Sequence, residues 1–371
     1  MEATKKTKDE IQAEALKKTL SLRNAGVEIS MGVGKTLLGL MHMDRLRKMY
    51  NKLDMKFLVV APKRSIFQSW IDEAEKNNMH DLVPCITFST YMSLKKQSYF
   101  YDAVYLDECH SLKESHDDYL FHAKLAGARM LGLTGTYPKF KSSEKAIMCN
   151  KYCPKVYVYK TDSAVEDKIL NDYRIYVHKI DLSREDNMDI QMGSKTWKTS
   201  EFKTYQYWSS RIENARTPKD LQILRVLRMK AMMSFKSKEQ KVLELLARRK
   251  TKTLLFANTQ EQADRLAPHS FHSNNPQSQE NLRLFKAGDI DLLSAVEQLS
   301  EGVTIPNLKS GIIMHAYSNN RKTAQKLGRL LRLNPDDTAG VHILCYRNTV
   351  DEDWVRSALS HLNQEKIIWL N

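Results

Sequence analysis

The sequence predicts an α/β protein with two domains, each built on a parallel sheet. The main observation is two clusters of short, continuously apolar segments, separated by stretches with helical periodicity. Strands of a parallel sheet are covered by helices on both faces, so they are apolar throughout instead of alternating. The length of 371 residues also fits two or three domains of about 150 residues each.

The apolar segments set the expected domain limits. The first cluster consists of FLVVAP (57–62), AVYLDE (103–108) and MLGLTGT (130–136). The second consists of TLLFAN (253–258), LLSAV (292–296), GIIMHA (311–316) and VHILCY (341–346). We therefore expect one lobe over residues 1–158 and a second over residues 159–371.

A region of different composition lies between the two clusters. Residues 195–250 have a helical pattern broken by Pro218, and they carry 15 Lys/Arg against 5 Asp/Glu. We expect an inserted basic helical arm there. With the net charge of +14, this concentration indicates a polyanionic partner, although a solvated helical face explains it equally well.

Composition excludes several classes of protein. Hydrophobic residues make up 42% and charged residues 27% of the chain, and no apolar stretch approaches the roughly 18 residues of a membrane helix. The amino terminus lacks the apolar core and cleavage site of a signal peptide, so we expect a cytoplasmic protein. The five cysteines are scattered, as in a reducing compartment. Cys149 and Cys153 form a Cys-x3-Cys pair without a second pair, so we expect no metal site from them.

The segment EISMGVGKTLLGL (28–40) has the parts of a phosphate-binding turn. Glycines let backbone NH groups surround a phosphate at a helix start, Lys35 can reach the terminal phosphates, and Thr36 can ligate Mg²⁺. The strict P-loop pattern requires a glycine six residues before the lysine, where this chain has Ile29. The alternative is a glycine turn that precedes a surface lysine.

Two further segments carry charged residues suited to phosphate chemistry. VYLDECHSL places Asp107 and Glu108 at the end of an apolar strand, where one acid can hold Mg²⁺ and the other can activate water. A solvated turn would look the same. QKLGRLLR places Arg329 and Arg332 three residues apart, on one face of a helix, where both could approach one anion. Taken alone, this pattern is more typical of surface arginines.

In this order the segments resemble the motifs of superfamily 2 helicases. Gly32-Val33-Gly34-Lys35-Thr36 resembles motif I, Asp107-Glu108-Cys109-His110 motif II of the DExH type, Thr134-Gly135-Thr136 motif III, and Gln325 to Arg332 motif VI. Weaker resemblances add Gln12 as an adenine-reading residue and Gly302 in a motif V-like segment. They also add residues that would contact or couple to nucleic acid, namely Pro62, Lys63, Thr90 and Thr259.

The resemblance implies an ATP- and Mg²⁺-dependent motor with two RecA-like lobes. Gln12, Gly302 and the turn from Gly32 to Thr36 would bind ATP, and Thr36 and Asp107 would hold the metal. Lys35, Asp107, Glu108, Gln325, Arg329 and Arg332 would carry catalysis. Thr134 and Thr136 would couple hydrolysis to movement along nucleic acid.

The resemblance also gives the arm a role. Trp197, Phe202, Tyr205, Tyr207, Trp208 and Phe235 are interleaved with basic residues, which suits phosphate contacts with base stacking. Phe202, Tyr205, Trp208 and Ile212 nevertheless fall near one helical face. We therefore expect these aromatics in the core, and nucleic-acid contact from Arg225, Arg228 and Lys230.

The form of motifs II and VI favours DNA over RNA. LDECHSLKESHDDYLFHAKLAGARMLGLTGT is similar to Swi/Snf-type translocases and to DNA repair and phage branch-migration helicases. We expect a compact, phage-like DNA helicase, without a membrane role and with an unknown replication or recombination partner. The alternatives are a duplex DNA translocase that does not unwind, an RNA helicase, and a non-catalytic binding or loading protein.

Overall fold

The chain folds into two compact units that divide between Asp172 and Tyr173. In this computed structural model, the described residues are 5–30, 32–138, 140–192, 195–296, 305–316, 337–360 and 362–371. The predicted division after residue 158 lies earlier, within the last strand of the first unit. Each unit contains its own parallel sheet, which confirms the predicted α/β class.

Unit 1 is built on a sheet whose described strands run in the order β3-β2-β4-β5-β1-β6. The neighbouring strands are parallel throughout. Their bounds are Asn24–Ile29 (β1), Phe57–Ala61 (β2), Ile86–Thr90 (β3), Ala103–Asp107 (β4), Arg129–Thr134 (β5) and Lys155–Tyr159 (β6). Pairing of Asp107 with Leu133 and of Glu28 with Thr134 brings the ends of β4, β5 and β1 to one edge.

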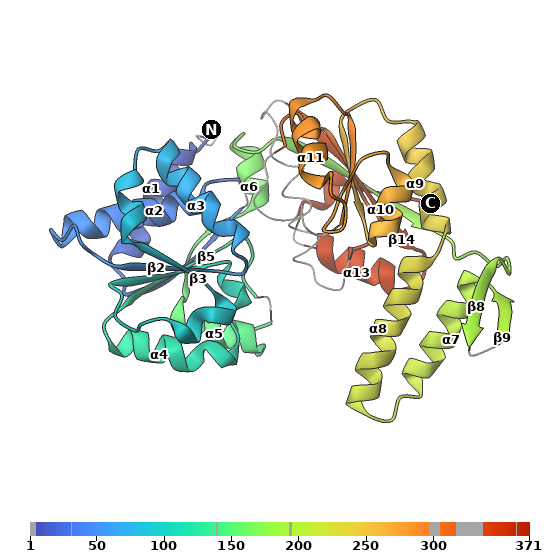
Figure 1. Cartoon of the computed structure of the whole chain (residues 1–371), viewed down its shortest axis with the longest axis horizontal. Coiled ribbons are helices and arrows are strands. Elements are labelled where there is room, and N and C mark those ends of the chain that lie inside the picture. Colours follow the sequence, from blue (N-terminus) through green and yellow to red (C-terminus); the bar gives the residue numbers. More distant parts are fainter. Residues whose placement is uncertain are drawn as a thin grey trace. The chain divides into compact units, whose positions relative to one another are not determined.

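Helices cover both faces of this sheet, as Figure 1 shows. α1 (Lys8–Leu20), α2 (Lys35–Met49) and α3 (Ser65–Lys76) lie on one face, and α4 (Asp117–Leu125) and α5 (Glu144–Tyr152) lie on the other. Alternate residues of one strand serve the two cores: Phe57 and Val59 pack with α1 to α3, whereas Leu58 and Val60 pack opposite. This double burial explains the continuously apolar strand sequences. The remaining helical segments are α6 (Thr161–Glu166), η1 (His80–Cys85), η2 (Tyr91–Lys96), η3 (Cys109–Ser111) and η4 (Glu114–His116).

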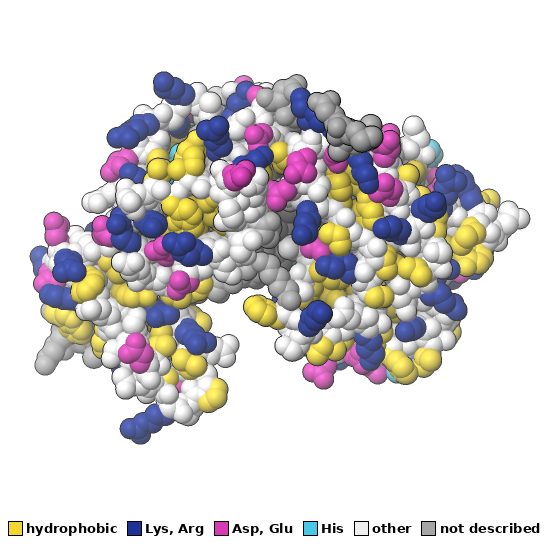
Figure 2. Space-filling model, turned by 180° about the vertical axis from the view of Figure 1, so that it is seen from behind, with side chains coloured by type: hydrophobic (Ala, Val, Ile, Leu, Met, Phe, Trp, Pro, Cys, Tyr) yellow, Lys and Arg dark blue, Asp and Glu magenta, His cyan; other side chains and the backbone are white. Residues whose placement is uncertain are grey.

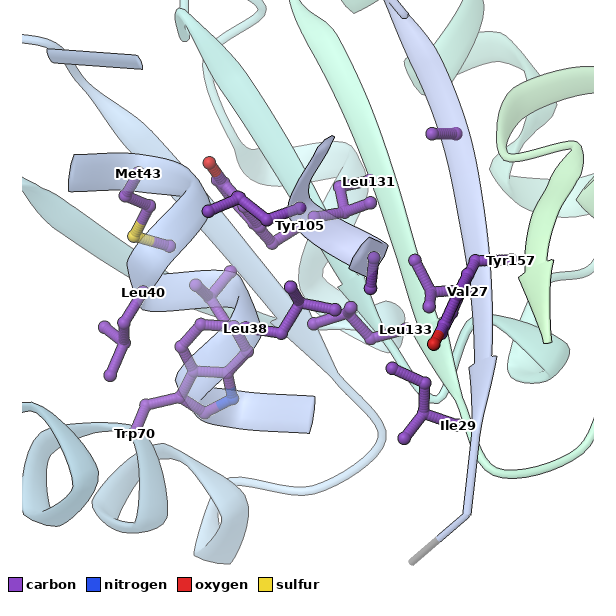
Figure 3. Close-up of a cluster of buried hydrophobic side chains, with 14 of the residues drawn as sticks. Val27, Ile29, Leu38, Leu40, Met43, Trp70, Tyr105, Leu131, Leu133 and Tyr157 are labelled. Carbon is purple, nitrogen blue, oxygen red and sulfur yellow. The ribbon is translucent and has the colours of Figure 1, made fainter. Parts of the chain in front are cut away.

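The core beneath α2 is closely packed around Trp70 (Figure 3). A Cβ on Gly39 would lie 2.4 Å from the Trp70 ring, so α2 can approach α3 only with glycine at that position. His42 of the same helix is buried, and its Nδ1 lies 2.9 Å from the Tyr105 hydroxyl. Burial lowers the pKa of His42 to about 3, so this histidine is neutral in the folded unit.

Unit 2 has a second sheet with the described strand order β11-β12-β10-β13-β14-β7-β15. Its strands are β7 (Asp172–Ile180), β10 (Thr253–Ala257), β11 (Ser270–Phe271), β12 (Leu292–Val296), β13 (Ser310–Ile313), β14 (Thr338–Tyr346) and β15 (Ile367–Leu370). They pack with α9 (Ser237–Ala247), α10 (Gln260–Leu266), α11 (Ser278–Ala287) and α13 (Val350–Leu359), and η6 spans Gln364–Lys366. All seven apolar segments predicted as strands are therefore confirmed. Every helix in the described parts of the chain is too short or too polar to span a bilayer.

The arm belongs to unit 2 and is only partly helical. β8 (Met188–Met192) and β9 (Lys195–Thr199) form an antiparallel hairpin, which α7 (Glu201–Glu213) and α8 (Pro218–Ser234) follow (Figure 1). The predicted helical start at residue 195 is thus wrong, because residues 195–199 pair as a strand. Pro218 begins α8 instead of breaking a helix, and the Thr217 side chain caps that helix by accepting from Asp220 N.

Candidate nucleotide-binding site

The predicted site residues of unit 1 follow five neighbouring strands at their carboxyl ends. The glycine turn follows β1, the paired acids end β4, and Thr134 ends β5. Pro62 and Lys63 follow β2, and Thr90 ends β3. The carboxyl edge of an open parallel sheet is where such folds bind ligands, so one edge of unit 1 collects these segments.

The turn after β1 is shaped to expose backbone donors. Gly32 and Gly34 have φ values of 92° and 96°, a left-handed conformation that glycine adopts without steric cost. α2 begins at Lys35 directly after Gly34, and no side chain caps its first turn. The start of α2 therefore presents uncapped NH groups and a positive dipole end, both of which favour a phosphate.

The side chain of Gln12 stabilises this turn through hydrogen bonds. Its side chain is buried, and its Nε2 donates to the carbonyl oxygens of Val33 at 3.1 Å and Gly34 at 3.5 Å. A Cβ on Gly34 would lie 2.3 Å from the same nitrogen, so the amide occupies space that only glycine leaves. Gln12 thus contacts the phosphate-binding turn itself, a position that its predicted adenine-reading role did not specify.

Asp107 is held rigidly in a buried position. The Trp70 indole nitrogen donates to its Oδ2 at 3.0 Å, and the Tyr91 hydroxyl donates to its backbone oxygen at 2.9 Å. Burial, and next the charge of Glu108, raise the pKa of Asp107 to about 6, against the opposing effects of Trp70 and Lys35. A divalent cation beside this carboxylate would favour its charged form, which suits the predicted metal ligand.

The backbone of Glu108 departs from the extended conformation of the preceding strand. It has φ 51° and ψ 53°, a left-handed conformation that is uncommon for a residue with a side chain. The Thr134 hydroxyl lies 3.1 Å from Glu108 Oε2 and 3.1 Å from the Thr136 carbonyl oxygen. The segment after β4 is thereby connected directly to the segment after β5, as the predicted coupling of Thr134 and Thr136 requires.

Three side chains at this site were not predicted from the sequence. His110 Nδ1 lies 3.3 Å from Glu108 Oε2 and also contacts the Thr134 hydroxyl. Trp70 and Tyr91 position Asp107, as described above. Trp70 and Tyr91 stand within segments that resemble helicase motifs, but their spacing from Asp107 in the sequence gave no indication of contact.

The remaining predicted residues of unit 1, and Thr259 of unit 2, are described by their exposure and their individual hydrogen bonds. Lys63 is exposed and Pro62 is half-buried. The Thr90 hydroxyl donates to Ser93 Oγ at 3.2 Å. Thr259 caps α10 by accepting from Gln262 N at 3.2 Å. The predicted residues Gly302, Gln325, Arg329 and Arg332 lie outside the described residues.

Within the arm, the three residues predicted to contact nucleic acid differ in exposure and in their contacts. Arg225 and Lys230 are exposed on α8. Arg228 is half-buried, donates to Ser209 Oγ at 3.1 Å and lies over the Tyr205 ring. Arg228 therefore helps to join α8 to α7, which leaves Arg225 and Lys230 as the freer cations of the predicted set.

The basic excess around the arm is also partly neutralised. Lys238 is fully buried and ion-paired with Asp351, while Lys203 pairs with Asp186 and Arg249 with Asp291. Figure 2 shows Lys and Arg side chains interspersed with acidic and hydrophobic ones over the face in view. Of the aromatics predicted for the core, Tyr205 packs against the cluster of buried Phe235, whereas Phe202 and Trp208 are only partly buried. Trp197 and Tyr207 are 43% and 51% exposed.

The fold and this edge together define a class: a nucleotide hydrolase with a phosphate-binding turn and a paired-acid strand end. Comparison with known families makes it more specific. Residues 237–334 match the family described as Helicase conserved C-terminal domain. Residues 2–85 match the family described as Type III restriction enzyme, res subunit.

Individual relatives agree with these matches. The chain is 23% identical over 363 residues to the DNA 3'-5' translocase XPB2 of Sulfurisphaera tokodaii, covering 90% of this chain and 80% of that protein. The Hef helicase domain of Pyrococcus furiosus superposes with a TM-score of 0.55 at 14% identity, covering 94% of this chain and 97% of that domain. A putative HsdR subunit of a type I restriction enzyme from Vibrio vulnificus gives 0.63 at 15% identity, covering 97% and 67%.

The chain is similar to superfamily 2 helicases in both family matches and in its translocase relative, in agreement with its motif order. It is accordingly a nucleic-acid-dependent ATPase. The structural neighbours, at low identity, share the fold of the chain.

Proposed function

We propose that this protein is a DNA translocase or helicase powered by Mg²⁺-dependent ATP hydrolysis. The observation that carries the proposal is the contact between Glu108, at the end of β4, and Thr134, at the end of β5. It joins the acid that would activate water to the segment that would respond to nucleic acid. The first turn of α2, which has no side-chain cap, would supply the phosphate-binding element.

Each residue of the edge has a distinct task in this proposal. Backbone NH groups of the turn and Lys35 would bind the terminal phosphates, while Thr36 and Asp107 would hold Mg²⁺. Glu108 would orient the attacking water and accept its proton, and Thr134 and His110 hold its carboxylate in place. Gln12 would keep the turn in its binding conformation, within reach of a bound adenine.

The second lobe would complete the site chemically. By their resemblance to motif VI, Gln325, Arg329 and Arg332 would contact the transferring phosphoryl group, and Gly302 would belong to the neighbouring motif. Arginine side chains stabilise the charge that develops there, so hydrolysis would depend on both lobes. This dependence would convert ATP turnover into movement along a strand.

Two observations support DNA as the track. A relative that aligns with 90% of this chain is described as a DNA translocase. A structural neighbour, the type ISP restriction-modification enzyme LlaBIII, was solved bound to DNA; it has a TM-score of 0.61 at 15% identity, with 97% of this chain and 31% of that chain covered. The net charge of +14 suits a polyanionic track.

The polymer is tested by measuring steady-state ATPase rates with single-stranded DNA, duplex DNA, forked DNA and single-stranded RNA. Stimulation by DNA above RNA is the expected result, and greater stimulation by RNA would contradict the DNA assignment. Strand displacement from the fork, measured in parallel, separates a helicase from a translocase that does not unwind.

The arm is tested separately with the double substitution Arg225→Glu and Lys230→Glu. If both cations contact phosphates, the slope of log affinity against log salt falls by about 2 units, since each lost contact removes roughly one counterion. A matched control reverses Lys17 and Lys286, which are exposed on other helices. An unchanged slope in the arm variant would assign DNA binding to other surfaces.

A further inference from the structure

Three buried thiols meet on the face of unit 1 opposite α2. Cys109 lies in η3, directly after Glu108, and Cys149 and Cys153 lie one helical turn apart at the end of α5. Their sulfur atoms all lie within 4.8 Å of one another, and none of the three residues is exposed. The sequence shows Cys149 and Cys153 as a pair only, and the fold adds the thiol of Cys109.

The protein builds this cluster from rigid parts. Cys149 Sγ contacts the Cys109 carbonyl oxygen at 3.4 Å, which fixes α5 to the segment after β4. Gly132 of β5 forms the floor, because a Cβ there would lie 2.7 Å from Cys153 Sγ and 3.1 Å from Cys109 Sγ. The Tyr137 hydroxyl donates to the Cys153 carbonyl oxygen at 2.8 Å and closes one side.

The distances suit a metal better than a disulfide. Metal–thiolate bonds of about 2.3 Å place the sulfurs of one ion roughly 4 Å apart, so the three thiols need to contract by less than about 1 Å. A disulfide would bring two sulfurs to about 2.0 Å and leave the third without a function. The arrangement therefore requires less movement of the packed core to surround an ion than to form a bond.

We propose that Cys109, Cys149 and Cys153 form a three-coordinate site for a soft monovalent cation of the Cu(I) type. Thiolates select soft ions, whereas structural Zn²⁺ sites usually take four ligands. Tyr137, which closes one side of the cluster, already donates its hydroxyl to a backbone carbonyl oxygen, so we do not count it as a fourth ligand. Binding would replace the thiol protons by the metal.

Metal binding at this site would affect the predicted ATPase residues through the polypeptide backbone. Cys109 is bonded to Glu108, whose left-handed backbone sets the direction of the water-activating carboxylate. Contraction around an ion would therefore displace Glu108 relative to Thr134. This second consequence rests on the proposed function, whereas metal binding does not.

The test is anaerobic titration of the whole protein with Cu(I) held by a colorimetric chelator. We expect one Cu(I) per chain to be taken from the chelator, with an X-ray absorption spectrum of three sulfur ligands, and expect Zn²⁺ to bind at least tenfold more weakly. Cys149→Ala and Cys153→Ala should each lose this binding. Cys85→Ala and Cys345→Ala, whose thiols lie outside the cluster, should retain it.

Thermal unfolding of every variant keeps the result interpretable, because a buried Cys→Ala change can also loosen the core. If Cys149→Ala fails to fold, Cys153→Ala decides, and if both fail, the sulfur count of the wild-type spectrum decides. Absence of Cu(I) binding by the folded wild type, or undiminished binding by either cluster variant, would overturn the site. If Cu(I) binds but leaves a measurable ATPase activity unchanged, only the coupling to Glu108 fails. If the metal-free protein has no ATPase activity with nucleic acid, the proposed function fails and the metal site stands.

Discussion

Two helices that directly follow sheet strands, one in each unit, begin in opposite ways. In unit 1, β1 leads through left-handed Gly34 into α2, whose first turn has no side-chain cap. In unit 2, β10 leads into α10, where the Thr259 hydroxyl accepts from Gln262 N. A helix start whose donors are capped by its own chain has less to offer a phosphate, whereas an uncapped start gains stability when a phosphate binds. The presence or absence of a side-chain cap in one turn thus determines whether the start of a helix after a strand has free NH groups for a ligand.

The same contrast holds for the buried charges. In unit 1, Asp107 has Trp70 and Tyr91 as neutral partners, so its carboxylate retains the capacity to bind a cation. In unit 2, Asp351 is paired with the buried ammonium of Lys238, which also donates to the carbonyl oxygens of Met314 and Leu344. Burial lowers the pKa of Lys238, and Asp351 opposes that shift. The charge in unit 2 is internally neutralised, which makes it a structural element.

The substitution Glu108→Gln should give the largest effect. It keeps the shape and removes the base, so ATP hydrolysis should fall by about 10²–10⁴-fold while ATP binding is preserved. Turnover assays and binding of a fluorescent nucleotide measure the two quantities. Glu114→Gln, on a neighbouring exposed turn, is the control, and equal turnover in both variants would contradict the assignment of Glu108.

Gly34→Ala tests the turn against a left-handed glycine of unit 2, Gly288, which ends α11. A side chain at φ 96° is strained and would also meet Gln12, so nucleotide affinity should fall by at least about tenfold. Gly288→Ala has nearly the same φ, 94°, and open space. That control should lose about 1 kcal/mol of stability without any change in nucleotide affinity, and the account of the turn is wrong if the two variants bind nucleotide equally.

Thr134→Val removes the hydroxyl that connects Glu108 to the segment after β5. Loss of a hydrogen bond to a charged group costs roughly 1.5–3 kcal/mol, so nucleic-acid-stimulated hydrolysis should fall about tenfold or more. Thr253→Val is the matched control, since Thr253 is a buried strand threonine of unit 2 whose hydroxyl contacts the Thr251 carbonyl oxygen. Equal stimulated rates in these two variants would show that the Thr134 contact does not contribute to hydrolysis.

The smallest expected effect is that of Thr259→Ala. Removal of the cap on α10 should lower the free energy of unfolding by about 1 kcal/mol, with nucleotide affinity unchanged. Denaturant unfolding and nucleotide binding measure these quantities. A loss of nucleotide affinity in this variant would mean that α10 also takes part in binding, and the contrast between the two helix starts would then fail.

Much of the fold follows from the sequence because buried parallel strands have an unambiguous pattern. FLVVA (57–61) and LLFA (254–257) are apolar at every position, and both lie in strands. β7 was not predicted, because DYRIYVHKI lacks the continuously apolar pattern of the other predicted strands and lies far in sequence from its partner β15. The β8–β9 hairpin was missed because residues 195–250 were interpreted by their helical periodicity alone.

The candidate site was predictable only in part. Lys35, Asp107 and Glu108 stand in short motifs whose chemistry can be recognised from residue types and spacing. The contacts of Asp107 with Trp70 and Tyr91, and the meeting of Cys109 with Cys149 and Cys153, join segments that only the fold brings together. Arg228 is predicted to contact nucleic acid, and its helical pattern could not show that it also donates to Ser209 Oγ on the neighbouring helix.

The most direct test of the central claim is the ATP hydrolysis rate of wild type and Lys35→Ala, each with and without DNA. The account predicts a DNA-stimulated rate for wild type and background hydrolysis for Lys35→Ala under both conditions. Thermal unfolding should show that both proteins are folded. Undiminished, DNA-stimulated hydrolysis by Lys35→Ala would show that the turn after β1 does not bind the hydrolysed phosphates, and the account would be wrong.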